Sequence, residues 1–222
     1  METDKPKTWH GPRGFFREYL IIVVGVLTAL GGQQAVDWIH QQGELAETRE
    51  ALREELAKDS SIIVTGAAVD RCRSELYAKY ADWARGGNRP EKVQLVGVPF
   101  PSFSAWDVAK AGPLSRMPVN ERLTYSQVYE RLEGQRTNDT NQLSVGLEMA
   151  QYFDLEQLAP DQAQRVLELN NAARTLVTGK GRTAADILND LQALGISPAP
   201  ASESRREAVN DFCKALGLPT PL

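Results

Sequence analysis

The sequence contains little histidine and little cysteine, and this scarcity excludes several kinds of site. Its 222 residues include 2 His and 2 Cys, whereas a zinc site built from these residues takes three or four of them. The histidines, His10 and His40, flank a long apolar segment, and none follows residue 40. Ser–His and Cys–His nucleophilic pairs are therefore excluded from the remainder of the chain. We predict no catalytic residue, no metal ligand and no cofactor.

An excess of positive charge is also absent. The chain has 25 Lys+Arg against 29 Asp+Glu, which gives a formal net charge of -4. Nucleic-acid-binding domains carry a basic patch, but the adjacent pair Arg205–Arg206 is balanced by Glu203 and Glu207. We therefore expect no nucleic acid among the partners. A charged fraction of 24% and an apolar fraction of 42% instead indicate a globular protein with a hydrophobic core.

Two short motifs have ordinary explanations. Residues 178–183 read Thr-Gly-Lys-Gly-Arg-Thr, but a phosphate-binding loop needs the spacing Gly-x-x-x-x-Gly-Lys-Ser/Thr after a strand. We prefer a turn between two helices at this position. The carboxylates of Asp186 and Asp190 share a helix face, as many solvated pairs do. Neither motif points to an enzyme.

Apolar residues are concentrated near the N-terminus. Residues 19–32 contain no charged side chain, and a helix from Tyr19 to Trp38 rises about 28 Å, close to the roughly 30 Å of a bilayer's hydrocarbon core. Aromatic residues at both ends, Trp9, Tyr19 and Trp38, are typical of membrane interfaces. We predict a cytoplasmic tail over 1–14 and a single transmembrane helix over 15–38.

The charges that flank this helix predict its orientation. The apolar run that begins at Tyr19 is preceded by Lys5, Lys7, Arg13 and Arg17, whereas the first cation after Trp38 lies a dozen residues further on. Because cations near a span stay in the cytoplasm, we expect the chain after Trp38 to be extracytoplasmic. Two alternatives stay open. One is a signal peptide cleaved near residues 29–31, and the other is a buried helix of a soluble domain.

Small residues form a stripe on the predicted span. Gly25, Ala29 and Gly32 are spaced i, i+4, i+7, and Gly31 with Ala35 forms a second small-xxx-small pair. Such stripes let helices approach closely in lipid, although glycine and alanine are also common in membrane spans. We predict that the protein forms a homo-oligomer or joins a larger membrane protein complex, in contact with the lipid bilayer.

The stretch from Arg17 to Leu27, followed by a Gln/Glu-rich helix, resembles the start of small uncharacterised bacterial proteins with one N-terminal transmembrane helix and an extracytoplasmic helical domain. Trp106 with residues 111–114, and the later stretch from Tyr125 to Tyr129, are similar to a second region of such proteins. The resemblance implies a location in the bacterial inner membrane with the domain in the periplasm. It implies no activity.

The rest of the sequence predicts an all-α fold, in which the span continues into a stalk helix over 39–66, followed by a helical domain over 67–222. Residues 44–85 contain no proline, and apolar residues recur at helical spacing. Turn residues then delimit shorter helices. The expected segments are 104–111, 118–134, 139–153, 160–179, 183–194 and 204–216, where Thr183 and Ser204 are expected to cap the last two.

One long connection, residues 91–103, is apolar and not helical. Val93, Leu95 and Val96 favour a short strand, but Pro99 and Pro101 exclude a central position in a sheet. Apolar loops of this length either make functional contacts or cover a core. The candidate residues for contact with a partner or ligand are Val96, Val98, Phe100, Phe103 and Trp106.

The two cysteines, Cys72 and Cys213, each lie on the apolar stripe of a predicted helix and so point to the core. In an oxidising compartment such a pair is a candidate disulfide between the first long helix and the last one. The alternative is two buried thiols that pack as small apolar groups.

Two classes of function fit these features. The first is an accessory or scaffolding protein that associates with other proteins through its span and helical domain. The second is a ligand-binding or envelope-sensing module that acts through a partner; the small molecule that it would bind is unknown.

Overall fold

The structure is a computed structural model that describes residues 12–93 and 95–222. Trp9 and the predicted tail up to residue 11 lie outside the described residues. The elements are helices α1 (Pro12–Ala84), α2 (Ser104–Lys110), the 3-10 helix η1 (Pro113–Arg116), α3 (Val119–Ala150), α4 (Pro160–Ala193) and α5 (Glu203–Ala215). No strand occurs in the described part of the chain, so the all-α prediction is confirmed.

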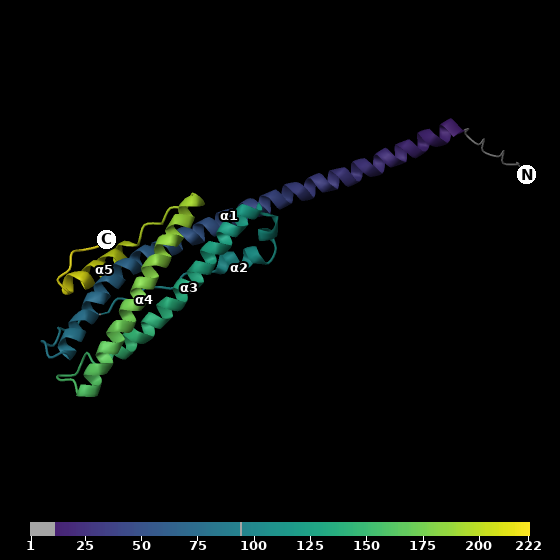
Figure 1. Cartoon of the computed structure of the whole chain (residues 1–222). Coiled ribbons are helices and arrows are strands. Elements are labelled where there is room, and N and C mark those ends of the chain that lie inside the picture. Colours follow the sequence, from purple (N-terminus) through teal and green to yellow (C-terminus); the bar gives the residue numbers. More distant parts are fainter. Residues whose placement is uncertain (1–11, 94) are drawn as a thin grey trace, which may run out of the picture. The chain divides into compact units, whose positions relative to one another are not determined.

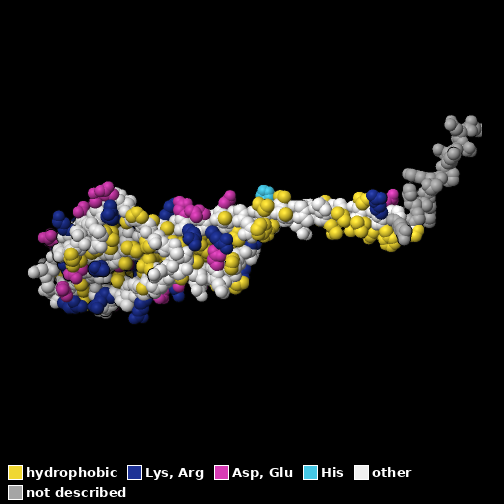
Figure 2. Space-filling model, turned by 90° about the horizontal axis from the view of Figure 1, so that it is seen from above, with side chains coloured by type: hydrophobic (Ala, Val, Ile, Leu, Met, Phe, Trp, Pro, Cys, Tyr) yellow, Lys and Arg dark blue, Asp and Glu magenta, His cyan; other side chains and the backbone are white. Residues whose placement is uncertain are grey.

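Two compact units share helix α1: the first ends at Glu47 and the second comprises Thr48–Leu222. Between Phe15 and Ile39 the helix exposes most of its apolar side chains, and the most apolar 18-residue window has no buried residue. Figure 2 shows apolar side chains gathered along this part and charged ones over the second unit. By length and composition, α1 is the one described helix that is apolar enough to cross a membrane.

The predicted continuation of the apolar helix into a stalk helix is confirmed, because α1 runs through Gly43 without interruption. The segment 39–66 is helical throughout. Its residues from Thr48 onward belong to the second unit, where Leu52 and Leu56 are completely buried. Their spacing of four residues places both side chains on one face of the helix.

The second unit is a bundle in which α3 and α4 pack along each other beside the C-terminal half of α1 (Figure 1). Apolar side chains at helical spacing meet in one core because each helix buries one face. Prominent members of this core are Val69, Leu76, Tyr80, Met149, Val166, Leu169 and Phe212. Tyr80 stacks on Phe153, with ring centroids 4.5 Å apart.

Two predicted helix breaks are wrong. Residues 118–134 and 139–153 form the single helix α3, and residues 160–179 and 183–194 form the single helix α4. Gly134, Gly179 and Gly181 therefore lie inside helices, and Thr183 is not a cap. A glycine inside a helix costs only about 1 kcal/mol relative to alanine, and packing along the bundle outweighs this cost.

Glycines with positive φ do end helices where the sequence indicated. Gly86 (φ 100), Gly195 (φ 66) and Gly217 (φ 77) follow α1, α4 and α5, in a backbone conformation that favours glycine. The N-terminus of α5 is displaced from its predicted position, because the helix begins at Glu203 with Ser202 as the N-cap residue and Ser204 lies inside it.

The connection between α1 and α2 contains no strand in its described residues, so Val93, Leu95 and Val96 do not form the short strand that their side chains would allow. A strand needs a partner for its backbone hydrogen bonds. Here the carbonyl of Val96 instead accepts a hydrogen bond from the Arg73 guanidinium at 2.9 Å. The connection thus lies on α1 as an irregular segment.

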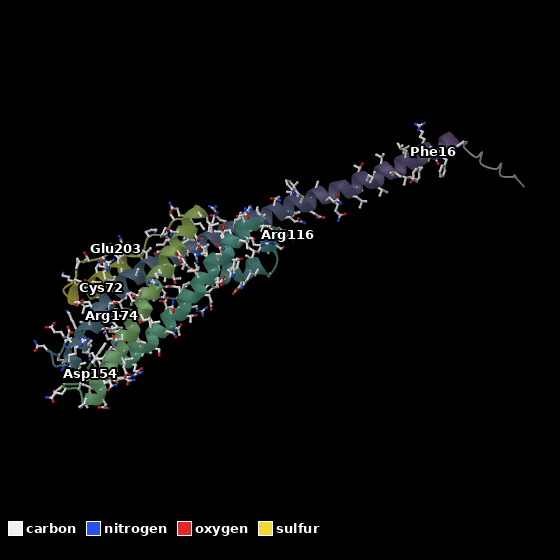
Figure 3. All side chains as sticks on the ribbon, in the orientation of Figure 1. Phe16, Cys72, Arg116, Asp154, Arg174 and Glu203 are labelled. Atoms are coloured by element: carbon white, nitrogen blue, oxygen red, sulfur yellow. A yellow bond between two sulfur atoms is a disulfide. The ribbon has the colours of Figure 1, made fainter. Side chains whose placement is uncertain are left out.

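The disulfide prediction agrees with the geometry. Cys72 of α1 and Cys213 of α5 have their sulfur atoms at bonding distance and their Cα atoms 5.3 Å apart, and Figure 3 labels Cys72 where α5 lies against α1. Both residues are buried in the core. Next to them, the Lys79 ammonium donates to the Leu216 carbonyl at 2.9 Å. The bond therefore attaches the last helix to the first across 141 positions of sequence.

Removal of this disulfide is expected to destabilise the bundle. A loop of this length gives an upper value of about 5 kcal/mol in the chain-entropy treatment, and native disulfides contribute about 2–5 kcal/mol. We expect Cys72→Ala/Cys213→Ala, in the full-length protein in nanodiscs, to unfold at a clearly lower denaturant concentration. Dithiothreitol should lower the midpoint of the wild type and leave that of the double variant unchanged. An equal response of both proteins would contradict the disulfide.

Candidate functional site

The five residues predicted to contact a partner or ligand separate into two hollows of the second unit. Val96, Val98 and Phe100 line one hollow, and Phe103 and Trp106 line the other. We call the first the Tyr77 cavity and the second the Trp106 pocket. The sequence grouped these residues as one candidate contact surface, but the structure assigns them to two sites.

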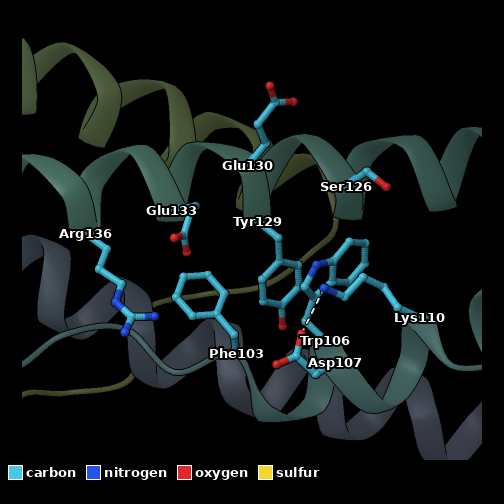
Figure 4. A pocket seen from close by; sticks show the side chains of 9 residues that line it. All are labelled: Phe103, Trp106, Asp107, Lys110, Ser126, Tyr129, Glu130, Glu133 and Arg136. Carbon is cyan, nitrogen blue, oxygen red and sulfur yellow. Dashed lines mark ion pairs between the residues drawn. The ribbon is translucent and has the colours of Figure 1, made fainter.

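The Trp106 pocket has an aromatic floor and a charged rim (Figure 4). The rings of Trp106 and Tyr129 are stacked, with centroids 4.5 Å apart and an interplanar angle of 10°, and Phe103 lies 6.1 Å from Tyr129. The hollow measures about 390 Å³. It is lined by Phe103, Trp106, Asp107, Lys110, Ser126, Tyr129, Glu130, Glu133 and Arg136.

Cations of the protein itself cover two of these rings. The Lys110 ammonium lies 5.7 Å from the Trp106 ring, and the Arg136 guanidinium lies 5.6 Å from the Phe103 ring. These distances allow cation–π attraction. Lys110 also forms an ion pair with Asp107 at 2.9 Å. The aromatic faces are therefore open only to a group that displaces these side chains.

Glu55 of α1 holds the aromatic floor in place. Its carboxylate accepts the Tyr129 hydroxyl at 2.8 Å and the backbone N–H groups of Ala105 and Trp106 at 2.9 and 3.3 Å. The first N–H groups of a helix have no partner within it and favour a negative charge. Glu55 thus supplies the cap that Phe103, the N-cap residue of α2, does not.

Asp59, one helical turn after Glu55, is a buried carboxyl group. It is 2% exposed, and its Oδ1 accepts the Ser102 N–H at 3.1 Å while its Oδ2 has no partner among the described residues. Burial raises the pKa of Asp59 to about 7, the Ser102 N–H opposes this shift, and the nearby Glu55 carboxylate adds to it. The carboxyl group is therefore protonated in mildly acidic solution.

This raised pKa makes the stability of the bundle depend on pH. Between about pH 4 and 7 the unfolded chain has lost the Asp59 proton that the folded state retains, so the free energy of unfolding falls as the pH rises and levels off above 7. Asp59→Asn keeps the acceptor for Ser102 and removes the titration. We expect this substitution to raise the free energy of unfolding by about 1–3 kcal/mol at pH 8 and to leave it nearly unchanged at pH 4.

The measurement is denaturant unfolding of the full-length protein in nanodiscs at several pH values. Asp82→Asn, at an exposed aspartate of the same helix, serves as the control and should keep the pH profile of the wild type. A profile for Asp59→Asn that is as steep as that of the wild type would show that Asp59 does not titrate in this window.

The Tyr77 cavity lies between the α1–α2 connection and helices α3 and α4, and measures about 420 Å³. Its apolar wall is formed by side chains of the connection and of α3: Leu95, Val96, Val98, Phe100, Leu143 and Leu147. Polar side chains form its floor: Arg73, Tyr77, Asp139, Gln142 and Lys180. An apolar wall with a few converging polar groups is typical of ligand sites.

A network of buried charges supports this floor. The Lys180 ammonium, on a side chain that is 4% exposed, lies 2.7 Å from Asp70 and 2.5 Å from Asp139 and donates to the Gln142 amide oxygen at 2.6 Å. The Gln142 amide nitrogen donates to Asp70 at 2.8 Å. Burial raises the pKa of Asp139, and Lys180 opposes that shift. All three ammonium protons thus have acceptors.

Tyr77 and Lys180 were not among the predicted site residues, and neither were Asp70 and Asp139, the carboxylate partners of Lys180. Lys180 falls in the apolar series Val166, Leu169, Ala173, Ala184, Ile187 and Leu191, which are buried along one face of α4. A lysine in such a series indicates a buried charge that needs a carboxylate. The turn predicted at residues 178–183 concealed this signal, because it separated Lys180 from the helix on either side.

The small-residue stripe lies in the first unit. A Cβ atom added at Gly25, Gly31 or Gly32 would meet nothing within 4 Å, and Ala29 and Ala35 are exposed. Tyr19 and Trp38, the described interfacial residues, are also exposed. The stripe contacts no other described part of the chain, so its role in association stays a prediction.

No group of three or more His, Cys, Asp or Glu residues that could hold a metal ion occurs in residues 12–93 and 95–222. Comparison with protein-family models, with curated proteins and with solved structures found no match to this chain.

Proposed function

We propose that this protein is a single-pass accessory or scaffolding protein of the bacterial inner membrane, and that its periplasmic helical domain associates with other polypeptides or with further copies of itself. The observation that carries the proposal is the apolar part of α1, whose most apolar window has no buried residue. Soluble proteins rarely expose an apolar surface of this extent. Lipid is the environment that would cover it on all sides.

The other features are consistent with this placement. Four cations precede the apolar helix, which favours a cytoplasmic N-terminus. The Cys72–Cys213 bond is typical of a domain in an oxidising compartment. The stripe of Gly25, Ala29 and Gly32 offers a surface on which a second helix can pack in lipid. The Trp106 pocket, with aromatic rings under displaceable cations, would suit a side chain of a partner protein.

The proposed membrane anchor can be tested by placing charged residues in its apolar segment. Val24→Arg/Leu27→Arg places two cations near the middle of the proposed span, and each costs about 2.5–3.5 kcal/mol of insertion free energy. We expect the wild type to stay with membranes after carbonate extraction and the double variant to lose most of this retention. Ala172→Arg/Ala185→Arg, at exposed positions of α4, should behave like the wild type.

The same cells test the orientation. Protease added to spheroplasts should remove the wild-type helical domain without lysis. A wild type that carbonate extracts, or a Val24→Arg/Leu27→Arg variant that membranes retain in full, would contradict the anchor. A domain that is cleaved only after lysis would instead contradict the periplasmic location.

Association through the span is tested with bulky residues in the stripe. Gly25→Leu/Gly32→Leu keeps the helix apolar but prevents close backbone approach. We expect the crosslinked oligomer, or the co-purified partner, to fall at least severalfold in mild detergent. Val26→Leu/Leu30→Ile, on another face of the same helix, should retain it. Unchanged association in the glycine variant would exclude this stripe as the contact surface.

A further inference from the structure

The Tyr77 cavity contains a buried hydroxyl group without a partner. Tyr77 is 1% exposed, and its hydroxyl oxygen makes no hydrogen bond to any described residue. Burial raises the pKa of this hydroxyl, so it keeps its proton and can donate. Leaving such a group unsatisfied costs about 1–3 kcal/mol, and folded proteins rarely do so. Tyr77 lines the cavity, and a small shift of its side chain would bring the hydroxyl to a bound molecule.

A glycine of α3 leaves room for this hydroxyl. Gly146 lies in the interior of α3 and is buried, and a Cβ atom at this position would lie 3.0 Å from the Tyr77 hydroxyl oxygen. That distance is too short for an ordinary contact, so any larger residue would press on the tyrosine. Glycine lowers the stability of a helix interior by about 1 kcal/mol relative to alanine. The Tyr77 hydroxyl thus takes the place of a side chain of α3, at a cost to the stability of that helix.

The mouth of the cavity is apolar. Phe100, Leu143 and Leu147 are 44%, 52% and 63% exposed, and the leucines lie one turn apart on the outer face of α3. These side chains flank the opening opposite the polar floor. A molecule with one polar end and one apolar chain would match both parts of the site.

The charges of the floor are already paired. Lys180 uses its three protons on Asp70, Asp139 and Gln142, and Arg73 binds Asp70 at 3.3 Å and the Val96 carbonyl at 2.9 Å. Two cations and two carboxylates leave no net charge. Because Lys180 and Arg73 already pair with carboxylates, a charged head group of either sign would meet a floor group of its own sign and no unpaired counter-charge. The floor therefore favours an uncharged head group that hydrogen-bonds.

We propose that the Tyr77 cavity binds an uncharged amphipathic molecule, an alkyl or acyl chain with an amide or hydroxyl head group. The head group accepts a hydrogen bond from the Tyr77 hydroxyl, and the chain packs against Phe100, Leu143 and Leu147. This site does not rest on the proposed scaffolding role. It holds whether the span associates with a partner or not.

The test is photolabelling of the full-length protein in nanodiscs. The label is octanamide with a diazirine in its chain, and the competitors are octanamide, octanoate and octylamine at equal free concentration. We expect labelled peptides to contain residues 95–100 and 143–147. Octanamide should suppress the labelling at a concentration at least tenfold lower than octanoate or octylamine.

Variants identify the hydroxyl group. Tyr77→Phe keeps the ring and should weaken competition by octanamide about fivefold, as expected for one hydrogen bond, while octanoate changes little. Gly146→Ala should weaken it as well, because the added methyl group occupies the space beside the hydroxyl. Tyr125→Phe is the matched control, since Tyr125 is likewise buried in the domain but does not line the cavity, and it should bind as the wild type does.

Three outcomes would overturn the proposal. One is equal competition by the amide, the acid and the amine, which would indicate adsorption of any alkyl chain. Another is unchanged competition in Tyr77→Phe, measured on protein that keeps the unfolding midpoint of the wild type. The third is that octanamide never suppresses the labelling of the cavity while residues of the cavity crosslink to another polypeptide. The cavity would then be a protein-docking surface. Membrane retention and oligomer crosslinking, measured on the same samples, test the scaffolding role separately.

Discussion

The ion pairs of Lys180 determine how the three long helices of the bundle fit together. One ammonium group, buried between α1, α3 and α4, contacts Asp70, Asp139 and Gln142. Removing one partner from such a buried network typically costs about 3–5 kcal/mol, because an uncompensated charge is left inside. Sliding any of the three helices by one turn would separate these groups. The network therefore fixes a register that apolar packing alone would leave less defined.

The same network determines what the adjacent cavity can accept. Arg73 joins it through Asp70 and extends it to the Val96 carbonyl, so the irregular connection that forms one wall is tied to the charged centre. Because every charge is matched, the cavity presents a neutral floor although four ionised side chains lie beside it. Tyr77 is the exception, a donor without an acceptor. The proposed preference for an uncharged head group therefore depends on both the paired charges and the unpartnered hydroxyl.

The sequence predicted those parts of the fold that depend on local pattern. The apolar N-terminal helix, its continuation into the bundle and the glycines that end α1, α4 and α5 follow from composition, periodicity and backbone conformation. The facing cysteines followed from helical spacing. The sequence failed where long-range contacts override local preference: Gly134, Gly179 and Gly181 suggested breaks that packing along α3 and α4 does not allow. The floor of the Tyr77 cavity was missed for the same reason, since its side chains come from three helices.

The two hollows differ in how their polar groups are satisfied, and this separates their roles. In the Trp106 pocket, Glu55 accepts the Tyr129 hydroxyl and two N–H groups of α2, and Lys110 and Arg136 cover the rings. The aromatic floor thus has its partners within the protein, so an incoming side chain must exchange one contact for another. In the Tyr77 cavity, a bound head group would supply a contact that the protein lacks. The first arrangement suits a reversible protein contact at the surface, and the second suits a small molecule held inside.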